Sequence, residues 1–248
     1  MTLSSDRRKI SRKTQRGYED FLIRLQSSPE NSQAYETLLS TLHLWNEASA
    51  SKTILVTSTK PAEGKTTITV NLALMMILTG KKVLVIDADV RKPQLHDIFQ
   101  LKNDQGFVDI LTGNRDLKDV IQKVEITNHT QHLSVITSGG IPENFFNDMT
   151  SLRLKEMIDL LGNIYDIILF DSSPVLSSND PLILASIIDG VILVLHTGMV
   201  MEREAKHAKE RLDSVGGHIL GIVLNKFDEK LHGLGFHPYH NYYKCRDQ

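Results

Sequence analysis

The chain has 248 residues, 41% of them hydrophobic and 23% charged, a composition typical of globular proteins and unlike that of disordered or fibrous ones. Its net charge of −2 supplies no global positive field, so nucleic acid is not an expected partner. The single cysteine, Cys245, excludes an internal disulfide and indicates a reducing compartment, which predicts a cytoplasmic protein.

Residues 1–30 are rich in arginine and lysine and show little periodic apolar content. We predict a basic, flexible segment there, with a basic arm that contacts anionic lipid or an acidic partner as the alternative. The opening lacks the apolar core of a secretory signal. The longest apolar run, 182–195, contains Asp189 and Gly190 and is shorter than a spanning helix requires, so no direct membrane span is expected.

The segment 35–45 carries apolar residues at helical spacing, which predicts one amphipathic helix before the core. Short apolar runs then alternate with helix-length patterns such as 66–78 and 152–161. The runs lie at 53–58, 82–89, 133–139, 166–174, 191–198 and 219–226. Because their apolar positions are continuous, each is expected to be a strand buried on both faces of a mostly parallel sheet. The pattern predicts a doubly wound α/β fold with helices on both faces.

The sequence TKPAEGKT, residues 59–66, matches the phosphate-loop template GxxxxGK[ST] at every position except the first. It lies between a predicted strand and a predicted helix, where backbone amides and the positive helix end would face phosphate. Lys65 is expected to neutralise phosphate charge and Thr66 to ligate Mg²⁺. A threonine-capped helix start is the alternative. The predicted ATP-binding loop comprises Thr59, Lys60, Pro61, Ala62, Glu63, Gly64, Lys65, Thr66 and Thr67.

Three acids follow predicted strands. Asp87 and Asp89 come after the apolar segment 83–86, and Asp171 follows another apolar run, in the arrangement of a Walker B acid. Each acid taken alone is about as consistent with a solvated loop residue as with a functional one. Because the carboxyl ends of parallel strands line the ligand crevice, three such acids in one chain favour a nucleotide site.

The phosphate loop, DADVRKP (87–93), GFVDILTG (106–113), IILFDSSPV (167–175) and ILGIVLNK (219–226) together resemble the bacterial tyrosine kinases of capsule and exopolysaccharide export, the CpsD/CapB type. The resemblance covers residues 31–228 and implies a P-loop kinase domain of MinD/ParA-like fold, followed by a flexible, tyrosine-containing tail at 229–248. It implies an autokinase that uses ATP and Mg²⁺ and regulates polysaccharide synthesis and export. Asp87, Asp89 and Arg91 match the specific hhhDxDxR segment of that family.

The resemblance also implies individual roles. Asp87 would accept or orient the tyrosine proton, supported by Asp89, and Asn225 matches a position that contacts the base, with a polar strand end as the alternative. The implied catalytic residues are Lys65, Asp87, Asp89 and Asp171, the metal ligands Thr66, Asp87 and Asp171, the further ATP contacts Arg91 and Asn225, and the phospho-acceptors Tyr239, Tyr242 and Tyr243. The spacing of His237, His240 and Cys245 matches no zinc site.

The chain departs from the family pattern at several positions. Ala62 replaces a usual glycine, and only Ser173-Pro174 remains of a diproline. Gln33, Glu36 and Leu39 stand where the self-assembly motif Glu-x-x-Arg-x-x-Arg is expected, so the ion pairs between subunits are missing and a homo-oligomer stays open. The expected partner is a membrane-spanning activator, a polysaccharide co-polymerase, which would recruit the protein to the inner face of the plasma membrane.

Two other functions stay open at this point. The first is an ATPase switch of the MinD/ParA kind without kinase activity, because Lys60 occupies the position of that class's signature lysine. The second is a catalytically silent nucleotide-binding scaffold, suggested by the altered assembly motif and the few tyrosines of the tail.

Overall fold

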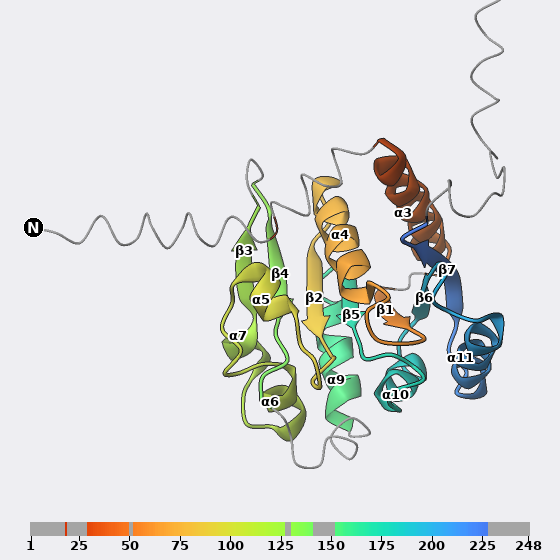
Figure 1. Ribbon diagram of the computed structural model, residues 1–248. Helices are drawn as coiled ribbons and strands as arrows, with labels where there is room; N and C mark the ends of the chain where they lie inside the picture. Colours follow the sequence, from red (N-terminus) through yellow and green to blue (C-terminus); the bar gives the residue numbers. More distant parts are fainter. Residues whose placement is uncertain (1–17, 19–28, 50–51, 127–129, 141–151, 228–248) are drawn as a thin grey trace, which may run out of the picture.

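The computed structural model describes residues 18, 29–49, 52–126, 130–140 and 152–227, and these form one α/β layer structure (Figure 1). The central sheet contains seven strands in the order β3-β4-β2-β5-β1-β6-β7. Their bounds are β1 Thr53–Ser58, β2 Val83–Asp87, β3 Gln122–Glu125, β4 His132–Ile136, β5 Ile167–Asp171, β6 Gly190–His196 and β7 Ile219–Asn225. All neighbours are parallel except β3 and β4, which confirms the predicted mostly parallel sheet.

Helices cover both faces of the sheet, as predicted. The helices are α3 Pro29–Ser49, α4 Lys65–Leu78, α5 Leu95–Phe99, α6 Phe107–Thr112, α7 Leu117–Val120, α9 Leu152–Gly162, α10 Asp180–Ala185 and α11 Glu202–Ser214. Along β1, Ile54 and Val56 pack with residues of α3, α4 and α5, whereas Leu55 packs with residues of α6, α9, α10 and α11. Because successive side chains of a strand point to opposite faces, the continuous apolar runs fill two cores at once.

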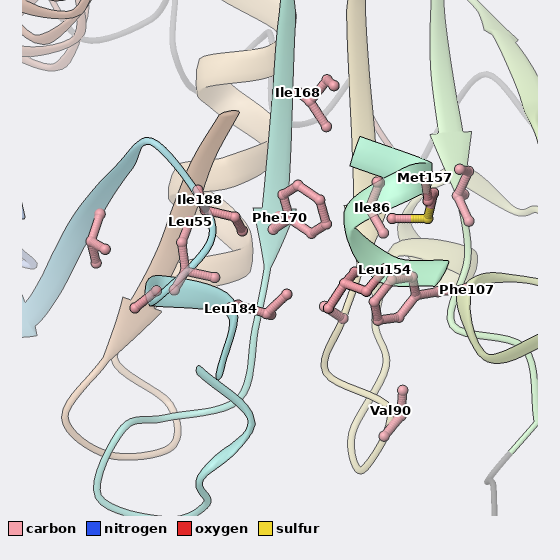
Figure 2. Packing of buried hydrophobic residues seen from close by; sticks show 14 of the residues in the cluster. Leu55, Ile86, Val90, Phe107, Leu154, Met157, Ile168, Phe170, Leu184 and Ile188 are labelled. Carbon is pink, nitrogen blue, oxygen red and sulfur yellow. The ribbon is translucent and has the colours of Figure 1, made fainter. Parts of the chain in front are cut away.

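The core beneath the site is built around β5. Phe170 of β5 lies in the middle of this core, and the ring of Phe107 from α6 packs against it edge to face, with ring centroids 6.4 Å apart (Figure 2). Leu154 and Met157 of α9 close the same cluster. The strand that carries Asp171 is therefore held by close-packed side chains up to the residue before the carboxylate.

The prediction that all six apolar segments are buried on both faces is wrong for β7. Ile222 and Leu224 are 53% and 58% exposed. β7 lies at the edge of the sheet, and among the described residues β6 is its one pairing partner, so no described strand lies on its outer side. A continuous apolar run shows that a segment is hydrophobic. Whether the strand is central or lies at the edge of the sheet, and hence how far it is buried, depends on the rest of the chain.

β3 was not among the predicted strands. Its sequence, QKVE, has one buried residue, Val124, and three partly buried or exposed ones. It is the other edge strand and pairs antiparallel with β4. An edge strand of this kind needs only one buried face, so its sequence holds too few apolar residues to be recognised as a strand.

The first helix is confirmed and extends beyond the predicted range, to Pro29–Ser49. Its side chains are described from residue 32 to residue 45. Leu42 is buried, and Leu39 packs against the core cluster of α4, whereas Gln33 and Glu36 are exposed. The position where the family motif places an arginine therefore holds a leucine that contributes to the core. Of the helices among the described residues, none combines the length and the hydropathy that crossing a membrane requires.

Candidate active site

The phosphate loop occupies residues 59–64, between β1 and α4. Gly64 precedes the helix in the left-handed region, with φ of 92°, and a Cβ added there would lie 2.0 Å from Nδ2 of Asn225. Glycine is therefore required both by the backbone and by the neighbouring side chain. Ala62 also has a positive φ, 67°, a conformation that glycine adopts without strain and that costs alanine about 1 kcal/mol. The first amides of α4 lack helical partners and are the natural cradle for phosphate.

Glu63 braces this loop from inside. The Glu63 side chain is buried, and its carboxylate accepts hydrogen bonds from the Thr59 amide at 2.7 Å, the Thr59 hydroxyl at 2.6 Å and the Lys60 amide at 3.2 Å. Thr59, which replaces the first glycine of the template, is thus held by its own hydroxyl. Glu63 and Thr59 are both predicted ATP contacts. In the structure, the Glu63 carboxylate and the Thr59 amide and hydroxyl are hydrogen-bonded to each other, and contacts of either residue with ATP stay a prediction.

Glu63→Ala is expected to lower the free energy of unfolding by about 2 kcal/mol, because it leaves the buried amide and hydroxyl of Thr59 without an acceptor. Glu63→Gln keeps one amide oxygen and is the matched control, with an expected loss below about 1 kcal/mol. Urea unfolding of both variants measures the difference. Equal losses for the two would show that these hydrogen bonds do not stabilise the loop.

The three predicted acids and Lys65 lie together at the carboxyl edge of the sheet. Asp87 and Asp171 end the neighbouring strands β2 and β5 and are direct register partners. The Lys65 ammonium lies 2.9 Å from Oδ2 of Asp89, and both side chains are largely buried. Parallel strands place their last residues side by side, so the sheet register brings the carboxylates to the helix that begins with Lys65.

Asp87 is held by backbone amides that no sequence motif marks. Its Oδ2 accepts from the amides of Gln94 and Leu95, each at 3.0 Å, and its Oδ1 from the Asp89 amide at 3.3 Å. Amides are available at every residue, so the sequence holds no signal for these contacts. They fix the carboxylate in one orientation above the end of β2.

Burial and mutual repulsion perturb the charges of this site. Burial first, and then the charge of Asp171, raise the pKa of Asp87 to about 8. Burial raises the pKa of Asp171 to about 6, although Lys65 and the Thr66 hydroxyl lower it. Burial lowers the pKa of Lys65, but Asp171, Asp89 and Asp87 together outweigh this and raise it. The site concentrates more negative charge than one lysine balances, which suits it to receive a cation.

The nucleotide-free protein is expected to lose stability as pH rises from about 4 to about 8. The folded state holds protons on Asp87 and Asp171 that the unfolded chain releases near pH 3.8, so the stabilisation present below that value is lost as pH passes the folded pKa values of about 6 and about 8. Urea unfolding in EDTA at pH 5.5, 7 and 8.5 measures this, with Asp87→Asn as the comparison. Parallel pH profiles for the two proteins would contradict it.

Asp171 has one oxygen, Oδ1, that is buried and without a hydrogen-bond partner among the described residues. A buried carboxylate oxygen without a donor is costly unless a cation or water meets it. The Thr66 hydroxyl interacts with the same side chain. These hard oxygen donors fit Mg²⁺. In the described ranges, no group of three or more His, Cys, Asp or Glu side chains is arranged to hold a metal ion by itself.

Three other predicted ATP contacts have partners within the chain. Asn225, at the end of β7, donates through Nδ2 to the Glu63 carbonyl at 2.8 Å and so fastens the loop to the sheet. The Lys60 ammonium lies 2.6 Å from Glu204 of α11. Arg91 extends to Asp180 at the start of α10, with 3.3 Å between Nε and Oδ2. Their contacts with ATP stay predictions.

The remaining predicted residues are Pro61 of the phosphate loop and Thr67 in the first turn of α4, which are both exposed, and the tail residues Tyr239, Tyr242 and Tyr243. The tail residues lie outside the described part of the chain, as do residues 1–17 and 19–28 of the predicted basic segment. The predicted phospho-acceptors therefore stay predictions.

Comparison with known proteins agrees with this geometry. Residues 51–203 match the family described as AAA domain. The chain is 34% identical to tyrosine-protein kinase YwqD of Bacillus subtilis over 88% of both chains. The kinase domain of Escherichia coli tyrosine kinase ETK superposes with a TM-score of 0.77 at 27% identity, over 83% of this chain and 79% of that one. MinD of Pyrococcus horikoshii, complexed with Mg-ADP, gives 0.60 at 25% identity over 72% of each chain.

The kinases match over more of the chain and superpose more closely than MinD, which disfavours the ATPase switch as the alternative. The chain belongs to the family of bacterial tyrosine-protein kinases that includes YwqD and CpsD.

Proposed function

We propose that this chain transfers the γ-phosphoryl group of ATP to tyrosine hydroxyls of proteins, its own C-terminal tyrosines among them, and thereby regulates polysaccharide synthesis and export. One observation carries the proposal: Lys65 at the start of α4 meets Asp87, Asp89 and Asp171 at the carboxyl edge of the sheet. Phosphoryl transfer requires mainly positioning and charge neutralisation, and this cluster supplies both.

Lys65 is suited to neutralise phosphate charge. Its ammonium is anchored by Asp89 and stays protonated, since the surrounding carboxylates raise its pKa. The amides of the first turn of α4 provide donors for the other phosphate oxygens. An ATP polyphosphate would thus meet fixed positive groups, which stabilise the charge that develops during transfer.

Asp171 and Thr66 would hold Mg²⁺, with Asp87 holding its waters, and when bound the ion would neutralise charge on the phosphate oxygens. The fit rests on the unpartnered, buried Oδ1 of Asp171 and on the excess of carboxylates over cations in the cluster. A second cation in this site would also relieve the repulsion between Asp87 and Asp171.

Asp87 is suited to accept the proton of the attacking tyrosine hydroxyl. Its pKa, raised to about 8 by burial and by Asp171, lies near the pH at which a general base works well. Three backbone amides hold the carboxylate in place, so it needs no rearrangement before the reaction. Tyr239, Tyr242 and Tyr243 are the proposed acceptors within this chain.

A membrane-spanning activator would recruit the protein to the inner face of the plasma membrane, and this part of the proposal rests on the family pattern in the sequence. The experiment uses the purified chain with ATP and Mg²⁺, with and without the activator's cytoplasmic segment, followed by mass spectrometry. Phosphotyrosine in the tail, absent after Tyr→Phe substitution at all three positions, supports the proposal. Phosphate release without phosphotyrosine supports the switch, and absence of ATP binding by calorimetry supports the scaffold.

A further inference from the structure

A hollow of about 350 Å³ lies beside the active site. Its walls are Arg91, Asp180, Arg211 of α11 and the loop 176–179. The volume is more than ten times the roughly 30 Å³ that one water occupies in the liquid, and it lies at the lower end of the range of ligand pockets. The hollow therefore has room for a side chain or a small anion.

The hollow is joined to the catalytic groups by short stretches of backbone. The loop 176–179 follows β5 and Asp171 in the chain. At its start, the Val175 amide donates to the Ser58 carbonyl at the end of β1 at 2.8 Å, and the Leu176 amide donates to the Thr59 carbonyl of the phosphate loop at 3.2 Å. On the other side, Arg91 lies two residues after Asp89, the partner of Lys65. The lining of the hollow is thus directly connected to the phosphate loop on one side and to the Lys65–Asp89 pair on the other.

The charge of the hollow is positive. Two guanidinium groups face one carboxylate, Asp180, which leaves a net charge of +1. Asp180 is buried and accepts from Nε of Arg91, whose side chain is 63% exposed. Arg211 donates to the Val175 carbonyl and, at 2.6 Å, to Oδ1 of Asn179. Both arginines are thus oriented from one side by acceptors of the protein itself.

Much of the donor capacity is left for a ligand. Each guanidinium carries five N–H groups, and among the described residues one of those of Arg91 and two of those of Arg211 have protein acceptors. Ser177 and Ser178 add hydroxyl groups to the wall. Planar guanidinium groups pair in a two-pronged way with carboxylates and phosphates, so an anionic group is the occupant that this wall fits.

We propose that the hollow is a specificity subsite that receives an anionic side chain of the acceptor polypeptide near the tyrosine to be phosphorylated. The anion is a glutamate or aspartate carboxylate, or the phosphate of a neighbouring phosphotyrosine. The inference rests on the proposed kinase activity, because it assigns the hollow to the acceptor. ATP has its own cradle at the phosphate loop, which leaves the hollow to the second substrate.

The test uses the full-length chain and three synthetic peptides with one central tyrosine, flanked by glutamates, by glutamines or by phosphotyrosine. Two readouts are taken: KM and kcat with ATP·Mg²⁺, and the Kd from fluorescence anisotropy with ADP-loaded protein, which needs no turnover. The variant is Arg211→Gln, at the guanidinium of the hollow that has no predicted role in ATP binding. Arg203→Gln, on the exposed side of the same helix α11, is the matched control.

Arg211→Gln is expected to raise KM and Kd for an anionic peptide about tenfold, with kcat and the glutamine peptide unchanged. The peptide with the larger effect identifies the carboxylate or the phosphate as the occupant. An equal loss with the glutamine peptide, or no loss with either anionic peptide, overturns the inference while tyrosine phosphorylation continues. Arginine-dependent binding without phosphoryl transfer would support the subsite and count against the kinase activity.

Discussion

Lys65→Ala is expected to lower the rate of ATP-dependent tyrosine phosphorylation by about 10²- to 10³-fold, the loss typical for removal of one fixed charge-stabilising group. Lys65 is the cation that lies among Asp87, Asp89 and Asp171, and its side chain is largely buried. Without it, phosphate would enter a cluster of carboxylates with no ammonium to offset them. The charge of Lys65 also lowers the pKa of Asp171, so the variant is expected to hold a proton where a metal ligand is needed.

The measurement is the initial rate of phosphotyrosine formation at saturating peptide, together with calorimetry of ATP binding. Lys118→Ala is the matched control, because that lysine is exposed on α7 and its ammonium lies 3.9 Å from the exposed carboxylate of Asp116. Thermal unfolding without nucleotide verifies that both variants are folded. A Lys65→Ala protein that keeps more than a tenth of the wild-type rate would exclude the proposed role of this lysine.

Asp87→Asn is expected to lower the rate of phosphorylation by about 10²- to 10⁴-fold, because an amide cannot accept the tyrosine proton. The same change removes a buried charge that burial and Asp171 disfavour. The amide oxygen still accepts from the backbone amides of Gln94 and Leu95. At pH 8 the nucleotide-free variant is therefore expected to be at least as stable as the wild type.

The combination of lost activity and retained stability separates a catalytic role from a structural one. Asp97→Asn is the matched control, since Asp97 lies on the short helix α5 with a side chain 82% exposed. Rates and urea unfolding at pH 8 are measured for both variants. A large fall in stability for Asp87→Asn would assign the carboxylate to holding the turn at residues 94 and 95, and a rate within tenfold of wild type would exclude it as the base.

The proposed subsite and the active site share one edge of the sheet but differ in sign. The active-site cluster has three carboxylates around one lysine, whereas the hollow has two arginines around one carboxylate. The first arrangement is suited to a metal ion and the second to an anionic side chain, as proposed above. An acceptor peptide with an acidic residue near its tyrosine would place the acidic residue in the hollow and the tyrosine at the active site.

The sequence by itself determined those features that depend on neighbouring residues. Continuous apolar runs predicted six of the seven strands, and the segment 59–66 predicted the turn from β1 into α4, with Lys65 and Thr66 at the start of the helix. The acids Asp87 and Asp171 were recognisable because each directly follows a run of four apolar residues. Such signals are local, since hydrophobic periodicity and turn chemistry act over a few residues.

The tertiary structure decided the features that join distant segments. The register of β2 with β5 sets Asp87 beside Asp171, and β7 brings Asn225 to the Glu63 carbonyl and against Gly64. The edge position that exposes Ile222, and the placement of Arg91 beside Arg211, likewise depend on the order of strands and helices. These contacts form only when the chain folds, because their energy depends on burial and on partners far apart in sequence, which no local pattern encodes.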